Sequence, residues 1–392
     1  MTTQQLVKKI SVDDHEPLEI KVKMASEYVD KFYCEQLRDP RDRLNAAKNN
    51  ITKVKQGLGD RGDRVWRDTV KSMYIAENIP AHYKNVAKFQ PSSRAFFKLN
   101  ECIVDLELLP SNTDGLTTVH LAEGPGGFIE NVQHIRKNPA DVYHGFTLPV
   151  KGSHLNFDES LVQSDESMGK IKVHYGDLYQ LKDIETLVNA VGANSVDFVT
   201  GDGGFDVSGD WNHQEQLSHQ IIYSEILAAV LLLKTGGHFV CKLFDTFSDV
   251  QIQMLEFLAT IFETVYLIKP VTSRPANSER YVVCKDFLGI SEKAYNPKKL
   301  KSIVNAWTKT VAGGKVFTKL FDGGTTSEPD ETHENPITTV RDNIIEFANT
   351  FADNQIKAIN NNLRIITNNI NIDTFDAQRE YSTKHLSKYF EV

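Results

Sequence analysis

Residues 117–128 read TTVHLAEGPGGF, and this stretch decides the fold. Its first part, Thr117–Ala122, favours a β-strand, the glycines after it indicate a tight turn, and residues 128–136 begin a helix. A glycine turn between a strand and a helix lets a ligand approach the backbone at the helix N-terminus and at the carboxyl end of the strand. Nucleotide-type cofactors bind at such turns, so the stretch predicts a cofactor site. The alternative is a tight turn that binds nothing.

The spacing of this turn disfavours two common ligands. It is not G-x-G-x-x-G, and Gly145-Phe146-Thr147, about 20 residues further on, lacks the carboxylate that would bind the ribose of NAD. Pro125 has no backbone N–H, and no Gly-Lys-Ser/Thr follows, so a phosphate-binding loop is disfavoured as well.

Short apolar strands and amphipathic helices alternate outward from the turn. Further strands are expected at Val196–Thr200, His238–Cys241, Thr264–Ile268 and Arg280–Cys284, and a long helix at Leu217–Lys234 that Gly236-Gly237 would end. This alternation is typical of an α/β protein with a parallel, Rossmann-like sheet and helices on both faces. The last two strands could pair as an antiparallel hairpin at one end of the sheet.

Three regions differ in composition. Residues 1–90 are polar and basic, with apolar residues at helical spacings, so we expect helices there. Residues 91–290 carry the α/β pattern, and residues 291–392 form an accessory region with an Asn-rich helical stretch around Asn360–Asn371 and no catalytic motif.

Charge is distributed unevenly over the 392 residues. The formal net charge is -8, which argues against a uniformly basic nucleic-acid-binding protein, and 40% hydrophobic residues indicate a folded globular chain. Residues 31–98, however, hold 15 Lys and Arg against 7 Asp and Glu, whereas residues 101–290 hold 12 against 26. The basic segment is either a tract that binds a polyanion or an ordinary solvated helix surface.

Other features narrow the setting. The four cysteines are far apart and form no C-x-x-C pair, so neither a metal site nor a disulfide framework is expected. The N-terminal residues lack the apolar core of a signal peptide, and the most apolar run, Ile226–Leu233, is shorter than the roughly 20 residues of a membrane span. We therefore expect an intracellular protein without a membrane segment, in the cytoplasm in preference to the nucleus because no obvious basic nuclear signal is present.

Four blocks resemble, in the same order, those of the FtsJ-like 2'-O-ribose methyltransferases. They are residues 120–128 (HLAEGPGGF), 200–205 (TGDGGF), 235–245 (TGGHFVCKLFD) and 269–283 (KPVTSRPANSERYVV). The likeness spans residues 91–285 and is closest to eukaryotic and viral members that methylate the first transcribed nucleotide of capped mRNA. It implies capped mRNA as the substrate, S-adenosylmethionine as the cofactor and, as possible partners, other capping or transcription proteins.

The resemblance also implies a catalytic Lys-Asp-Lys-Glu tetrad, made here of Lys98, Asp202, Lys242 and Glu279. Lys242 would activate or steer the ribose 2'-hydroxyl, Asp202 would orient Lys242, and Glu279 would orient both lysines. The positive charge of Lys98 would lower the pKa of Lys242, because a neighbouring like charge disfavours the protonated amine. The neutral amine could then accept the proton of the hydroxyl. Each residue also has an ordinary alternative: a solvated lysine, a turn-forming aspartate, the first exposed residue after a strand, or a turn cap.

The resemblance and the basic segment together give the expected ligand contacts. The cofactor would contact Glu123, Gly124, Pro125, Gly126, Gly127, Phe128, Asp177 and Asp202. The RNA and its cap would contact Arg61, Arg64, Arg94, Trp211, Asn212, Arg274 and Asn277. Arg67, Lys71, Lys84 and Lys88 could extend a phosphate-binding rim, and Trp66 is a second stacking candidate. The segment around Trp211 departs from the family's pattern, and a salt-bridged surface helix is the alternative for the basic residues.

Two other functions stay open from the sequence. A ribosomal or transfer RNA 2'-O-methyltransferase would use the same tetrad. A non-catalytic cap-binding subunit of a capping complex could keep the fold, although it would have no chemical need of the four tetrad residues.

Overall fold

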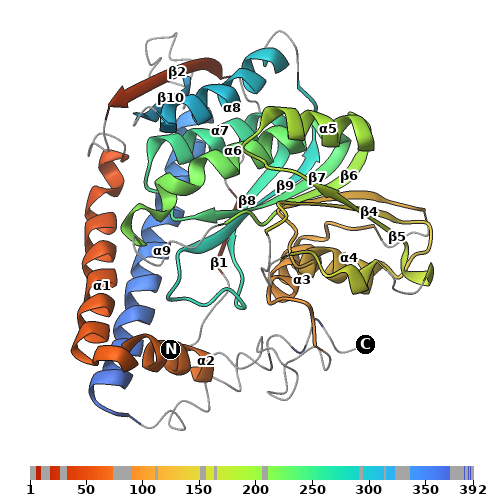
Figure 1. Cartoon of the computed structure of the whole chain (residues 1–392). Coiled ribbons are helices and arrows are strands. Elements are labelled where there is room, and N and C mark those ends of the chain that lie inside the picture. Colours follow the sequence, from red (N-terminus) through yellow and green to blue (C-terminus); the bar gives the residue numbers. More distant parts are fainter. Residues whose placement is uncertain are drawn as a thin grey trace.

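The computed structural model describes residues 6–9, 18–26, 33–73, 90–110, 114–150, 156–162, 166–204, 211–290, 295–312, 315–322 and 336–370, together with positions 384, 387 and 389. Its centre is an eight-stranded sheet in the order β1-β8-β9-β7-β6-β3-β4-β5 (Figure 1). The strands β3 (Thr117–Leu121), β4 (Val142–Thr147), β5 (Lys170–Tyr175), β6 (Val196–Gly201) and β7 (Leu233–Phe244) run parallel to one another. The predicted Rossmann-like sheet is confirmed.

One end of the sheet is antiparallel. β8 (Phe262–Lys269) and β9 (Glu279–Phe287) form the predicted antiparallel pair, and β9 lies between β8 and β7. A short strand, β1 (Leu6–Lys9), extends this edge by pairing with β8. β7 and β9 therefore lie side by side near the middle of the sheet, and each brings part of one of the four sequence blocks to the same edge.

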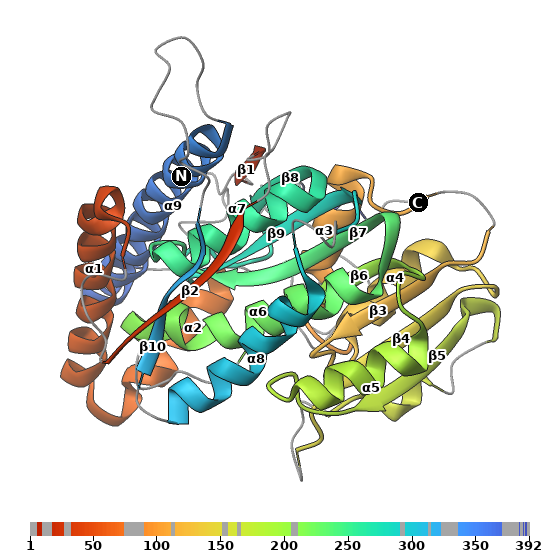
Figure 2. The ribbon, with the colours of Figure 1, turned by 90° about the horizontal axis from the view of Figure 1, so that it is seen from above.

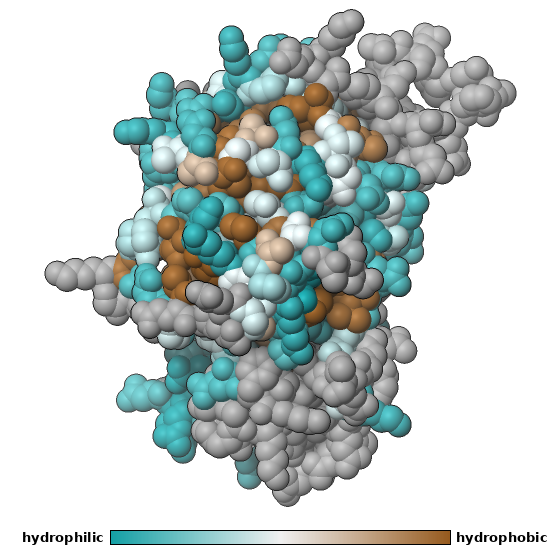
Figure 3. Space-filling model, turned by 90° about the vertical axis from the view of Figure 1, so that its right-hand side faces the viewer, coloured by the Kyte–Doolittle hydropathy of each residue, from teal (hydrophilic) through white to brown (hydrophobic). Residues whose placement is uncertain are grey.

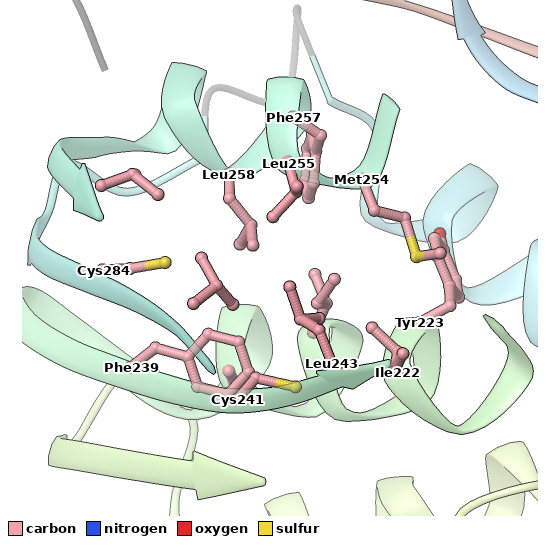
Figure 4. Close-up of a cluster of buried hydrophobic side chains, with 14 of the residues drawn as sticks. Ile222, Tyr223, Phe239, Cys241, Leu243, Met254, Leu255, Phe257, Leu258 and Cys284 are labelled. Atoms are coloured by element: carbon pink, nitrogen blue, oxygen red, sulfur yellow. The ribbon is translucent and has the colours of Figure 1, made fainter. Parts of the chain in front are cut away.

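Helices cover both faces of the sheet, as predicted. On one face lie α5 (Leu181–Val191), α6 (Gln214–Leu232) and α7 (Asp249–Ile261), and on the other α3 (Ala95–Leu106) and α4 (Gly127–Arg136) (Figures 1 and 2). Successive side chains of a strand point to opposite faces. Accordingly Phe239, Cys241 and Leu243 of β7 pack with the α6 and α7 side chains (Figure 4), whereas Val240 packs in a second core with α3 and α4.

The regions outside the central block pack on the same body. α1 (Arg38–Gly57) and α9 (Pro336–Thr367) lie side by side (Figures 1 and 2), with an ion pair of 2.7 Å between Arg43 and Asp353. Also present are α2 (Gly62–Met73), α8 (Pro297–Ala312) and a two-stranded antiparallel sheet of β2 (Glu19–Ser26) and β10 (Lys315–Asp322). Short 3-10 turns occupy Glu35–Leu37, Gly59–Arg61, Glu159–Leu161, Glu166–Met168 and Trp211–His213. The N-terminal region is thus not helical throughout, because it supplies β1 and β2 as well.

The end of α6 differs from the prediction. The helix ends at Leu232, and β7 begins at the next residue, so Gly236-Gly237 does not cap the helix. Gly236 instead has a φ of 80° within an irregular start of β7, where Val196 pairs with Leu233 but Phe198 pairs with His238. The glycines accommodate these extra residues of β7 rather than the helix terminus.

Exposed apolar side chains are scattered over the described surface and do not by themselves indicate a binding site. Figure 3 shows the side of the molecule that carries β4, β5 and α4, where apolar patches lie among polar side chains. Large exposed apolar side chains include Leu148, Val150 and Tyr175, which lie near the ends of β4 and β5, and some exposed apolar surface is usual in folded proteins. Within the described ranges no helix is long and apolar enough to cross a membrane, and no group of three or more His, Cys, Asp or Glu is arranged to hold a metal ion.

Candidate active site

The sheet brings the predicted tetrad to one place. β7 and β9 are paired so that Lys242 faces Tyr281 and Phe244 faces Glu279. By the two-residue period, Lys242 shares the face of Val240, and Glu279 shares the face of Tyr281. Both Val240 and Tyr281 pack in the core that α3 covers, and α3 carries Lys98.

Hydrogen bonds link the four residues in two pairs. Lys98 Nζ lies 2.7 Å from Glu279 Oε2. Lys242 Nζ donates to the main-chain oxygen of Asp202 at 2.7 Å and lies 3.2 Å from its Oδ1. Tyr281 donates its hydroxyl to the same Oδ1 at 3.2 Å. Lys98, Lys242 and Glu279 are each only 8% exposed, so these pairs are largely removed from solvent.

Electrostatics set the charge of two of these groups. Burial alone would raise the pKa of Glu279, but Lys98, Lys242 and a third lysine, Lys269, outweigh it and hold that pKa far below its usual value. Burial alone would lower the pKa of Lys242, yet the carboxylates of Asp202, Glu279 and Glu225 raise it above the usual value. The expectation of a lowered pKa for Lys242 is therefore wrong, because these carboxylates outweigh burial and Lys98 is itself paired with Glu279.

Two residues of this centre were missed from the sequence. Lys269, at the end of β8, is buried and donates to Ser273 Oγ at 2.8 Å, and it also hydrogen bonds the main-chain oxygen of Glu279. Glu225, on α6, accepts from the Gly203 backbone N–H at 2.8 Å, and burial raises its pKa to about 8. Lys269 begins the sequence block 269–283, but the pattern there does not distinguish a buried lysine from an exposed one. Glu225 lies within an apolar helix and belongs to no motif.

The glycine turn is held tightly by its own residues. Glu123 Oε1 accepts from the backbone N–H groups of Phe128 and Ile129, both at 2.8 Å, and so caps the start of α4. Burial raises the pKa of Glu123 well above its usual value. Gly126 has a φ of 123°, and a Cβ there would lie 2.5 Å from Leu161 Cδ1. A Cβ on Gly127 would lie 2.1 Å from Ser93 Oγ. The backbone conformation therefore favours glycine at position 126, and the close approach of Ser93 favours it at position 127.

The predicted cofactor residues gather along one edge of the sheet. Gly124, Pro125 and the rest of the turn follow β3, Asp202 follows β6, and Asp177 follows β5, so all lie at the carboxyl ends of parallel strands. Asp177 Oδ1 accepts from the Tyr179 backbone N–H at 2.9 Å, which leaves its other carboxylate oxygen for a ligand. A carboxylate edge beside a glycine turn suits a cationic nucleotide-type donor, so the residues present fit the implied cofactor.

A cavity of about 330 Å³ adjoins the tetrad at Glu279 and Phe244. Trp66 and Lys55 line it from the N-terminal helices, Gln355 lines it from α9, and predicted RNA contacts also line it, namely Arg94, Arg274 and Asn277. The cavity thus combines an aromatic ring, cationic side chains and amides next to the proposed reaction centre.

Other predicted RNA contacts lie elsewhere. Arg61 and Arg64 are exposed and do not line the cavity, and Arg64 lies 3.6 Å from Asp68 on its own helix, which favours the salt-bridged alternative. Asn212 donates to Asn49 Oδ1 at 3.2 Å. Trp211 begins a 3-10 turn, but its side chain is outside the described residues, as are Lys84 and Lys88 altogether. Their RNA contacts stay predictions.

Comparison with known proteins identifies related chains. The model of the FtsJ-like methyltransferase family matches residues 91–287. A zebrafish (Danio rerio) protein named cap-specific mRNA (nucleoside-2'-O-)-methyltransferase 2 is 31% identical over 62% of this chain, and the mouse (Mus musculus) methyltransferase 1 of the same name is 39% identical over 45%. These matches cover only 35% and 22% of the two relatives' own lengths. A crystal structure described as a ribosomal RNA methyltransferase from Plasmodium falciparum aligns with 51% of this chain and all of its own, at 18% identity and a TM-score of 0.37.

Proposed function

Since the chain belongs to the FtsJ-like methyltransferase family, we propose that it methylates the ribose 2'-hydroxyl of the first transcribed nucleotide of capped mRNA. The observation that carries the proposal is the convergence of the Lys98–Glu279 and Lys242–Asp202 pairs at the edge of the sheet where the glycine turn lies. The names of the zebrafish and mouse relatives support the cap as the substrate.

S-adenosylmethionine, when bound, would supply a methyl group on a positively charged sulfur. The turn at Gly124–Gly127, with Asp177 and Asp202, would hold it at the carboxyl ends of β3, β5 and β6. Asp202 would connect the methyl donor with the RNA, because it would contact the donor and also holds Lys242 through two of its oxygen atoms. The carboxylate near the donor and the lysine near the acceptor are therefore positioned by one another.

Lys242 would take the proton of the ribose 2'-hydroxyl. The 2'-oxygen would attack the methyl carbon while the bond between that carbon and sulfur breaks. The products are the methylated ribose and S-adenosylhomocysteine. To accept a proton, Lys242 must first be neutral, and a positive charge bound beside Asp202 opposes the carboxylates that raise its pKa. Holding oxygen, carbon and sulfur in line adds to the rate, because positioning alone can contribute about 7 kcal/mol or more.

The cavity beside Glu279 is the proposed place for the cap and the first nucleotides. Trp66 offers a face for stacking a base, and Arg94 and Arg274 offer charge for phosphates. The acidic total of the chain does not conflict with this, since the cationic groups lie on the side of the site where RNA would enter.

A methyl-transfer assay on matched short RNAs tests the proposal. The RNAs differ only at the 5' end (triphosphate, guanosine cap or 7-methylguanosine cap) and in whether the first or second ribose already carries a 2'-O-methyl group. We expect transfer to capped RNA at the first ribose, and none when that ribose is blocked. Equal transfer to uncapped RNA would point to the ribosomal or transfer RNA class, transfer only to the second ribose would refute the assigned position, and cap binding without transfer would indicate a non-catalytic subunit.

A further inference from the structure

The side of β9 opposite the tetrad is held by the C-terminal helix α9. Arg280 follows Glu279 directly, so its side chain points to the other face of the strand, where it is completely buried. Its guanidinium carbon lies 3.5 Å from the ring centroid of Phe351, on α9. Arg280 also lies 3.2 Å from Asp245, which follows β7 three residues after Lys242. Arg280 therefore connects the ends of β7 and β9, which carry Lys242 and Glu279, to Phe351 of α9.

The same ring also faces Lys269. The Lys269 ammonium lies 5.3 Å from the Phe351 ring centroid. It donates to Ser273 Oγ at 2.8 Å and hydrogen bonds Asn277 Oδ1 and the main-chain oxygen of Glu279. Ser273 in turn donates to Glu279 Oε1 at 2.7 Å, while Lys98 holds Oε2 of the same carboxylate. Lys269 thus holds the loop from Ser273 to Glu279 through hydrogen bonds, and the Phe351 ring covers its amine, whose pKa burial lowers well below the usual value.

Gln355 adds a second contact one helical turn further along α9. Its Nε2 donates to the main-chain oxygen of Ala276 at 3.3 Å and lies 3.4 Å from Ser278 Oγ. Phe351 and Gln355 are four residues apart and so lie on one face of the helix. Both are nearly fully buried, at 3% and 1% exposure. This face of α9 contacts the loop from Ser273 to Glu279, and Gln355 also lines the cavity beside Glu279.

We propose that α9 is a positioning element for Glu279, acting through Phe351 and Gln355. This rests on the proposed function, because the role of Glu279 belongs to it. Buried cationic side chains need partners, and the Phe351 ring lies over Arg280 and faces Lys269 in addition to the hydrogen bonds of both residues. Without the ring, Lys269 and Arg280 each lose one contact and a space opens beside them, so the loop from Ser273 to Glu279 that Lys269 holds shifts. The carboxylate of Glu279 then no longer meets Lys98 and Ser273 in the present geometry.

Phe351→Leu tests the role of the ring, with Phe321→Leu as the matched control. Phe321 is equally buried in the C-terminal region but stacks on Phe257 and not on a cation. Because a displacement of about 1 Å in a catalytic group can cost roughly a hundredfold, we expect kcat to fall about ten- to a hundredfold in Phe351→Leu. KM for the methyl donor should change by less than about twofold, since Phe351 is remote from the glycine turn. Gln355→Met, which removes the amide donor at similar volume, should lower kcat in the same direction even if Phe351→Leu does not fold.

Hydrogen exchange gives a readout that does not depend on activity. Amides of residues 276–287 should exchange faster in Phe351→Leu and in Gln355→Met than in the wild type, and should be unchanged in Phe321→Leu. Unchanged exchange in both α9 variants would overturn the proposal, and so would faster exchange with an unaltered kcat. A wild type that methylates no capped RNA would instead refute the proposed function, and the exchange data would still decide whether α9 holds the loop.

Discussion

Replacing Lys242 by Met removes the proposed base and keeps most of the volume of the side chain. In the structure its ammonium makes two contacts with Asp202, at 2.7 and 3.2 Å, and no other lysine contacts that residue in the described part of the chain. General base catalysis typically contributes about 10²- to 10⁴-fold, so the loss should raise the barrier by about 3 to 5 kcal/mol. Methyl-donor affinity should change much less, because the glycine turn and Asp177 are untouched.

Single-turnover transfer of a radiolabelled methyl group to a short capped RNA measures this barrier directly. Calorimetry of donor and RNA binding separates affinity from chemistry. Lys285→Met is the matched control, since Lys285 is also a partly buried lysine of the central sheet and donates to the main-chain oxygen of Leu106 at 2.8 Å, away from the tetrad. A Lys242→Met protein that transfers methyl within about tenfold of the control rate, with normal binding, would refute the assignment of the base.

Three further predictions concern neighbours of the site. Burial raises the pKa of Glu225 to about 8, so this residue should contribute a loss of up to about 1.4 kcal/mol of stability per pH unit as pH rises from about 5 to 8. Other buried glutamates, Glu101 and Glu215, contribute in the same direction, so Glu225→Gln should make the fall in stability shallower by its own share in thermal unfolding measured across that range. Glu279→Gln leaves Lys98 without its buried carboxylate and should lower the free energy of unfolding by about 3 kcal/mol or more at neutral pH. Urea titrations should show the difference between variant and wild type shrinking below about pH 4.5, because the low pKa of Glu279 stabilises the wild type only above that pH. Trp66→Leu should weaken binding of capped RNA by about 1 to 3 kcal/mol in a fluorescence anisotropy titration, while an unchanged affinity would remove Trp66 from the RNA site.

The sequence predicted the sheet and the convergence of the tetrad because both depend on local patterns. Alternating strands and helices predict parallel strands, and the carboxyl ends of parallel strands share an edge, so Asp202 and Lys242 were expected to meet. For these two residues the place followed from a position at the end of a strand. Glu279 was expected beside them from the resemblance alone, and the structure brings it there because β9 pairs with β7.

Features that depend on contacts between distant segments were not predicted. Phe351 and Gln355 carry no motif, and their partners lie more than 70 residues away. β1 is only four residues long and is stabilised by pairing with β8, more than 250 residues later in the chain. The end of α6 was predicted wrongly for a related reason. Gly236 and Gly237 suggested a helix cap, but they belong to the irregular start of β7, which pairs with β6.

The pKa of Lys242 shows why geometry was needed even where the residues were known. Sequence gives two lysines in the tetrad, and two like charges suggest a lowered pKa. In the structure Lys98 is paired with Glu279, so Lys242 experiences mainly the carboxylates around it and its pKa is raised. A raised pKa favours the charged form of Lys242, and a cation bound beside Asp202 would oppose the carboxylates that raise it. In the proposed mechanism the base therefore becomes active only when the methyl donor is in place, and the acidic surroundings that first looked unsuitable for an RNA enzyme provide that coupling.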